Sequence, residues 1–498
     1  MTLFSAKFFE ILKTFSAAEL KSFESWLQSP WCNTNKNLLT LLQKTKKYYP
    51  DFVNDRITKE RLFKQVLPTG KYSNRRMNNL LSEGYKAAEK FVIFQKLSSD
   101  TNLQNNLKIQ EFQERHLDDW FFRDTEKEIT RLEEKEIKNH DDYLYSSLLH
   151  RRRYHYSDSG NRAKYGSTDL LKTEESSETV YLAEKAFIIN EKIFRTRITR
   201  EKYSEIKQEI DKWSVAAEEF DIPAFTFYRL RFRHYRTGQT EDFLILKRYF
   251  TENYASFNLT DKKIFLISLI NENIQLLKAQ ELPTTSPLPL YKIGMENNLL
   301  LYKNILSKFT YVSLVTLSNT ARDFAYTRKV INDYADNLHH HLREDTVRWA
   351  EAHTAYYQNE LHRALDLLLH YTPSDTFIRN RSKFLTVQIY FDIYLKDASY
   401  SDFLVSYLEN TEKWYRREDY KSKDYKQSNL RFIQICRKLV KAWQNPDLAI
   451  EKIENLLKTE KNLQGAEWLQ RKIDFIISVK TEGSSAKRMT SSDIQPRD

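Results

Sequence analysis

Residues 349–373 read WAEAHTAYYQNELHRALDLLLHYTP, and this stretch decides the fold. Residues 349–357 and 361–368 each place apolar side chains at the three- and four-residue spacing of an amphipathic helix. The polar residues between them predict a short turn, and Pro373 follows the second helix. Small residues at 352, 355 and 364 lie where two such helices would touch. The stretch therefore predicts a packed pair of helices.

The whole chain shares this helical character. Only eight of its 498 residues are glycine and ten are proline, where an average chain of this length holds roughly 35 and 25. These two residue types supply most tight turns, so a chain that nearly lacks them has long uninterrupted elements. Aromatic residues make up 14% of the chain, and their large rings suit the gaps between stacked helices. The composition predicts an all-α protein.

Charge, cysteine content and the first residues narrow the class of protein. The net charge of +11 is a mild excess that favours anionic partners without requiring them. Cys32 and Cys436 are the only cysteines, so a disulfide framework and a thiolate zinc site are excluded. The first residues lack a signal peptide's basic leader and apolar run, and no apolar stretch of about 18 residues exists. We expect a cytoplasmic protein that does not associate with membranes.

The first hundred residues predict an N-terminal helical module. Ser16 and Glu19 form a capping box at the start of a helix that ends near Pro30. The further helices predicted here cover about 35–48, Thr58 to Leu67, and Ser73 onward.

Composition divides the rest of the chain. A cluster of small polar residues with two glycines predicts an exposed loop over 157–179, and three prolines predict an extended linker over 282–289. The other predicted segments are two connecting helices over 101–156 that separate near Asn139, helical hairpins over 180–281, a helical solenoid over 290–478 and a disordered tail over 479–498.

The helix pair at 349–373 resembles one tetratricopeptide unit, with small residues at the helix contact, aromatic residues beside them and a proline after the second helix. Neighbouring pairs around 376–416 and 424–457 share this style without a strict period. The resemblance implies an α-solenoid of degenerate TPR-like helical hairpins.

A second resemblance covers most of the chain. Its N-terminal matches are 15–19, 23–27, Ser29-Pro30, Asn33, Asn35, Tyr49-Pro50, Phe52 and 58–63, and its later matches are 342–344, Tyr356-Tyr357 and Ala364-Leu365. In these motifs the chain resembles a family of uncharacterised bacterial all-helical proteins of similar length. The resemblance supports the fold and implies no chemistry.

Motifs for catalysis are missing. Gly160 and Gly166 are the only glycines near one another, and they match neither a P-loop nor a dinucleotide fingerprint. Adjacent acidic pairs such as Glu133-Glu134 diverge on a helix and do not form an acid–base couple. Each lone cysteine is expected to be a small core residue. We expect a non-catalytic protein with no cofactor.

The histidines do not predict a metal site. His339, His340 and His341 are consecutive, so they point in different directions on a helix. The stripe of His362, Asp366 and His370 has four-residue spacing, but leucines define the opposite, buried face, so we expect this stripe to face water.

Two basic–aromatic segments are the candidate binding sites. Arginines flanking a groove can hold phosphates or carboxylates, and the alternative is that their stems cover aromatic surface while their heads stay in water. The candidate residues are Arg151, Arg152 and Arg153 at the end of one helix, and Arg229, Arg233 and Arg236 beside a stripe formed by Phe225, Tyr228, Phe232 and Tyr235.

The sequence favours a scaffold that binds a peptide or protein on a concave helical surface. Where this partner meets the arginines, we expect the partner to be acidic. The alternative is a nucleic-acid-binding protein that uses the basic–aromatic helix faces or the N-terminal helical module. A third hypothesis is an enzyme with an unfamiliar helical site. The sequence specifies neither the partner nor the oligomeric state.

Overall fold

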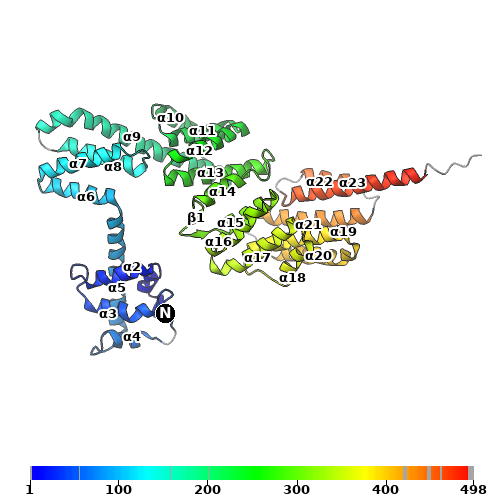
Figure 1. The fold of residues 1–498 in the computed structure, drawn as a ribbon, viewed down its shortest axis with the longest axis horizontal. Helices are drawn as coiled ribbons and strands as arrows, with labels where there is room; N and C mark the ends of the chain where they lie inside the picture. Colours follow the sequence, from blue (N-terminus) through cyan, green and yellow to red (C-terminus); the bar gives the residue numbers. More distant parts are fainter. Residues whose placement is uncertain are drawn as a thin grey trace, which may run out of the picture. The chain divides into compact units, whose positions relative to one another are not determined.

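The computed structural model describes residues 3–54, 57–156, 159–199, 201–418, 423–445, 450–459 and 463–491. These residues form 23 α-helices, five short 3-10 helices and one two-stranded hairpin, which confirms the all-α prediction (Figure 1). The chain divides into two compact units, Met1–Lys185 and Ala186–Asp498. The long helix α9, Ser159–Ile198, contributes residues to both units.

The first unit contains eight helices before α9. They are α1 (Lys7–Leu12), α2 (Ala17–Gln28), α3 (Lys36–Thr45), α4 (Lys59–Val66), α5 (Asn74–Ser99), α6 (Thr101–Glu114), α7 (Asp118–Glu133) and α8 (His140–His155), with 3-10 helices at Leu3–Ser5 and Lys46–Tyr48.

The second unit begins within α9 and continues with shorter helices. They are α10 (Ile206–Ala216), α11 (Pro223–Thr237), α12 (Thr240–Glu252), α13 (Leu259–Lys278), α14 (Leu288–Glu296), α15 (Lys308–Thr320), α16 (Phe324–Tyr334), α17 (His340–Tyr357), α18 (Leu361–Leu369), α19 (Thr376–Lys396), α20 (Ser401–Arg417), α21 (Lys423–Gln444), α22 (Glu451–Thr459) and α23 (Ala466–Ser491). The strands are β1 (Leu301–Tyr302) and β2 (Ile305–Leu306), and 3-10 helices lie at Tyr254–Ser256, Ala335–Asn337 and Ala398–Tyr400.

Local capping signals place the first helices correctly. Both bonds of the predicted capping box are present, from the Glu19 amide to Ser16 Oγ at 3.2 Å and from the Ser16 amide to Glu19 Oε2 at 2.6 Å. Thr58 and Ser73 cap α4 and α5 as predicted. In α5, a Cβ at Gly84 would lie 3.0 Å from the Phe8 ring, so glycine permits the close packing of α1 on α5.

The segment 101–156 was predicted to form two helices and forms three. The additional break lies between α6 and α7, where the chain reverses at Arg115–Leu117 with His116 in the left-handed region, at φ 56°. A buried core then joins α6, α7 and α8, and the Phe121 ring stacks on Tyr156 with centroids 4.4 Å apart. No glycine or proline marks this break, which is why the sequence pattern missed it.

The predicted exposed loop over 157–179 is wrong, because α9 begins at Ser159. Residues 157 and 158 lie outside the described residues. Polar side chains within α9 are accommodated by contacts: the hydroxyls of Thr173 and Thr179 donate to the carbonyls four residues earlier, and Asp169 is fully buried in an ion pair. The threonine bonds are local to α9, and the ion pair of Asp169 with Arg153 is a tertiary contact; together they outweigh the loop-forming tendency of the composition.

Two further predictions of irregular structure are corrected. The linker 282–289 is a hydrogen-bonded turn rather than an extended segment: the Ser286 amide donates to the Pro283 carbonyl at 2.9 Å, and α14 already begins at Leu288. The tail predicted over 479–498 is helical as far as Ser491, because no proline interrupts α23. Residues 492–498 lie outside the described residues.

The stretch 349–373 forms the predicted helix pair. Its two helices are α17 and α18, which pack against each other, and Leu361, Leu365 and Leu368 are buried at their contact. The helix α17 also packs on α15 and α19. The β1–β2 hairpin was not predicted; its turn residues Lys303 and Asn304 both have positive φ.

Candidate functional site

The first predicted arginine cluster lies at the C-terminal end of α8. Arg151 is exposed, whereas Arg152 is half-buried. The Arg152 guanidinium donates to the side-chain oxygens of Asn106 and Gln110, at 2.7 and 3.2 Å. Burial lowers the pKa of Arg152. Arg153 is buried, so of the three predicted binding residues only Arg151 is fully available to solvent.

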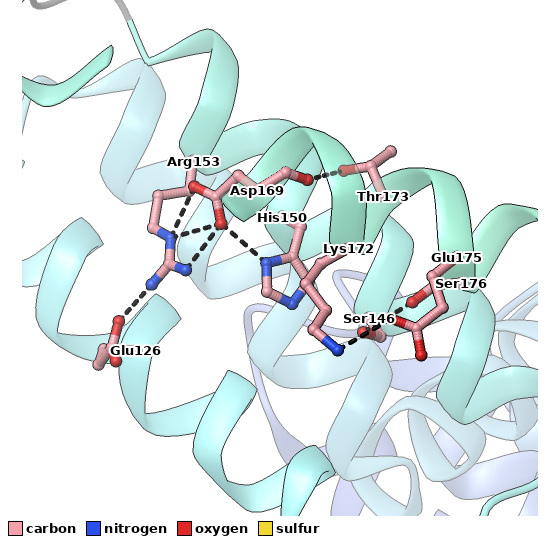
Figure 2. Close-up of polar contacts among 9 residues, drawn as sticks. All are labelled: Glu126, Ser146, His150, Arg153, Asp169, Lys172, Thr173, Glu175 and Ser176. Carbon is pink, nitrogen blue, oxygen red and sulfur yellow. Dashed lines mark hydrogen bonds and ion pairs between the residues drawn. The ribbon is translucent and has the colours of Figure 1, made fainter. Parts of the chain in front are cut away.

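Arg153 belongs to a buried cluster of charged side chains that joins α7, α8 and α9. Figure 2 shows Arg153, His150 and Asp169 pointing toward one another, with Glu126 on the other side of the guanidinium. Arg153 donates to both carboxylate oxygens of Asp169, from Nε to Oδ2 at 2.9 Å and from Nη2 to Oδ1 at 2.7 Å. His150 Nδ1 donates to Oδ1 at 2.8 Å, and Arg153 Nη1 pairs with Glu126.

This cluster is suited to holding helices together. A fully buried carboxylate is costly unless cations and hydrogen bonds compensate it, and Asp169 receives both from α8. Within the part of the chain that the structure describes, no hydroxyl or thiol hydrogen-bonds to the His150 ring. The cluster therefore fixes α9 on α8.

The second predicted arginine row lies on α11, and each of its residues has a partner within the chain. Arg229 donates to the Ala217 carbonyl at 2.9 Å, Arg233 pairs with Asp242 at 2.8 Å, and Arg236 pairs with Asp211 at 2.5 Å. In the adjacent stripe, Phe225, Tyr228 and Phe232 are buried as predicted, while Tyr235 is only partly buried. Whether the row also binds an external anion stays a prediction.

Of the two cysteines expected in the core, Cys436 is buried, whereas Cys32 is only half-buried in the turn after α2. His362 and Asp366 are exposed on α18, and His370 is exposed directly after it; among the described residues no group of metal-binding side chains occurs. Cys436 is buried in α21, and burial raises the pKa of its thiol well above the ordinary value. In the described ranges, no helix combines the length and apolar character needed to cross a bilayer.

A cavity of about 690 Å³ opens in the second unit where the α17–α18 turn meets three other elements. We call it the turn cavity. It is bounded by the turn after α15, the α17–α18 turn, α19 and the first turns of α23. Aromatic and polar groups share its wall, which includes Phe324, Tyr356, Tyr357, Trp468, Arg322 and Arg471.

A chain of hydrogen bonds fixes the wall of the turn cavity. Trp468 Nε1 donates to the Tyr356 hydroxyl at 2.8 Å, and that hydroxyl donates to Asp392 Oδ2 at 2.7 Å. Lys472 Nζ lies 2.5 Å from Asp392 Oδ1. Burial and Asp392 raise the pKa of Tyr356 well above its usual value, so the hydroxyl stays a donor. The wall is thus rigid, and its central carboxylate is already neutralised.

Two cations on the rim of the turn cavity are not compensated. Arg322 follows α15 and Arg471 lies on α23, and both are exposed. Neither has a carboxylate partner among the described residues. Because Asp392 is paired with Lys472, the rim presents unpaired positive charge beside aromatic surface. Tyr356 and Tyr357 were recognisable in the sequence as part of a helix pair, but nothing there pointed to Asp392, Trp468 or the two arginines.

Comparison with known proteins gives no relative: no family model, no curated protein and no solved structure matches this chain. We therefore infer the function from the geometry of the site alone.

Proposed function

We propose that this chain is a non-catalytic protein-interaction scaffold whose second unit is a degenerate TPR-like solenoid of helix pairs. In support, α17 contacts both α15 and α19, and each of these three helices also packs against the helix that follows it. Stacked helix pairs of this kind present an extended surface on which peptides and proteins bind. The proposal assigns no cofactor or metal to the chain.

The turn cavity is the observation that carries the proposal. Its aromatic wall offers apolar surface for a side chain, and the hydrogen-bonded Tyr356 and Trp468 are held in place before any ligand arrives. The unpaired Arg322 and Arg471 on the rim complement a negative charge. The ligand that fits is an acidic peptide segment of a partner protein, with an apolar side chain next to an aspartate or glutamate.

Peptide selection tests the proposal. The purified full-length chain is screened against a displayed library of short random peptides, and enriched peptides are synthesised with a fluorophore for anisotropy titration. We expect acidic peptides with an adjacent apolar residue to be enriched. The double variant Arg322→Glu/Arg471→Glu should weaken their binding at least tenfold, equivalent to about 1.4 kcal/mol.

The matched control is the double variant Lys413→Glu/Lys329→Glu, which makes the same charge change at exposed positions of α20 and α16 outside the cavity. It should leave the affinity within about twofold of the original, since a remote exposed charge contributes little. Enrichment of peptides without regard to charge, or an unchanged affinity in the Arg322→Glu/Arg471→Glu variant, would contradict the proposal.

A further inference from the structure

The net positive charge of the chain is concentrated in its first fifth. Residues 1–100 hold 17 Lys and Arg against nine Asp and Glu, so this segment carries +8 of the total of +11. These residues form helices α1–α5 around one hydrophobic core. The remaining residues carry only +3, so this N-terminal segment supplies most of the chain's net attraction for polyanions.

One face of α5 is lined by polar side chains that have no partner. Arg75, Asn79, Ser82 and Lys86 follow one another at spacings of four, three and four residues, and all four are exposed. They lie on the side of the helix opposite the buried Met77, Leu80, Leu81 and Gly84. None has a hydrogen bond or ion pair within the described residues. We call these four residues the α5 stripe.

Further cations lie on α4 and on the turn that joins it to α5. Arg61 on α4 and Lys71 in the turn are exposed and have no carboxylate partner in the described part of the chain. Of the nearby acids, Glu60 pairs with Lys64, while Glu83 accepts from the neutral Asn35 amide and Glu89 lies three residues after Lys86. The cations of the stripe and its surroundings outnumber these carboxylates, so the packed helices α4 and α5 carry a net positive charge here.

We propose that this α4–α5 face binds double-stranded DNA, with the α5 stripe in the major groove and Arg61 and Lys71 at the phosphates. The stripe spans about 16 Å along the helix axis, and the major groove of B-DNA, about 12 Å wide, admits one α-helix. Arginine and asparagine are the side chains that pair best with guanine and adenine edges there. The inference goes beyond the scaffold function, since it concerns the other unit of the chain.

Other polyanions fit this face less well. The major groove of duplex RNA is deep and narrow, so a helix cannot enter it to reach the bases. An acidic peptide would satisfy the cations but would leave Asn79 and Ser82, at the centre of the stripe, without an evident role. Base edges carry both donors and acceptors, which those two side chains can meet.

Selection from a random duplex DNA pool, followed by anisotropy titration of the full-length chain at several salt concentrations, tests the inference. We expect a preferred duplex to emerge. Arg61→Ala and Lys71→Ala should each weaken binding to every duplex and flatten the slope of log K against log salt by about 0.9, because each removes one phosphate contact. Arg75→Ala removes a base contact and should weaken binding to the preferred duplex by roughly tenfold. Asn79→Ala should weaken binding to the preferred duplex by roughly tenfold and leave the salt slope unchanged.

Two controls keep the test independent of folding and of the scaffold proposal. Lys329→Ala, at an exposed position of α16, removes the same charge far along the sequence and should leave both affinity and slope unchanged. Arg322→Glu/Arg471→Glu should also bind DNA normally. Absence of duplex binding at low salt, equal binding to duplex RNA or heparin, or no effect of the Arg61, Lys71 and Arg75 variants would overturn the inference. Circular dichroism of each variant confirms that the exposed substitutions preserve the helices.

Discussion

At the scale of single residues, His353 is a buried base whose neutral state is fixed by its neighbours. The Asn319 amide nitrogen donates to His353 Nδ1 at 2.9 Å, and Asn319 Oδ1 lies 3.0 Å from the Thr327 hydroxyl. The ring also stacks on Tyr357, with centroids 4.8 Å apart. Burial, together with the charge of Arg381, lowers the pKa of His353 from 6.5 to about 3.

This lowered pKa predicts how stability depends on pH. Above pH 6.5 the histidine is neutral in both states, so its full contribution to folding is present. As the pH falls from 6.5 toward 3, His353 becomes protonated in the unfolded chain but stays neutral in the folded chain. The free energy of unfolding therefore decreases by about 1.4 kcal/mol per pH unit. His353→Gln, which keeps an acceptor for Asn319, should reduce the slope of unfolding free energy against pH by that amount.

The measurement is urea unfolding at a series of pH values from neutral to mildly acidic. His362→Gln, on the exposed side of α18, is the matched histidine removal and should reproduce the slope of the unaltered chain. Equal slopes for His353→Gln and the unaltered chain would show that His353 does not titrate as argued.

At the scale of elements, the helices of this glycine-poor chain end in a recurring turn. After α6, α13, α14, α15 and α17, one residue with positive φ is followed by a residue whose amide bonds five residues back, the pattern of a Schellman motif. The residues with positive φ are His116, Gln280, Asn298, Arg322 and Asn359. Glycine would adopt this conformation without the steric cost that a Cβ brings.

Glycine at these positions should therefore stabilise the chain. His116 and Gln280 are exposed, so replacing each by glycine removes strain and no packing. We expect each substitution to raise the free energy of unfolding by about 1 kcal/mol in urea titrations. A substitution to glycine within a helix should act in the opposite direction. Lys127→Gly, at an exposed position of α7, should lower the free energy of unfolding by about 1 kcal/mol. A loss of stability in both turn variants would contradict the strain argument.

The same turns show how far sequence alone could go. Helix starts at Ser16, Thr58 and Ser73 were predictable because a cap is read from neighbouring residues. The break at His116 was not, since a left-handed residue other than glycine leaves no mark in composition. The wall of the turn cavity was not predictable either. Tyr356 hydrogen-bonds to Asp392, 36 residues later in the chain, and to Trp468, 112 residues later.

At the scale of the whole molecule, the net charge is distributed unevenly along the chain. The summed charge of +11 suggests a mild, diffuse excess, yet most of it lies in residues 1–100, and a count by segment would have found it in the sequence. The ion pair of Asp169 could not have been found in this way. It depends on α9 being a helix, and the local composition of residues 157–179 argues against one.

The division into two units predicts that damage to one need not spread to the other. Asp169→Asn removes a fully buried carboxylate, so His150 loses its charged partner and Arg153 keeps only Glu126, a loss worth about 3–5 kcal/mol. Hydrogen exchange should then show reduced protection in α7, α8 and the part of α9 before Ala186, while α15, α17 and α19 keep theirs. The control Glu175→Gln breaks only an exposed pair with Lys172 and should change little. An equal loss of protection in α17 would contradict this prediction. The substituted contact is confined to α7–α9, so its loss can affect α17 only if the two units unfold together.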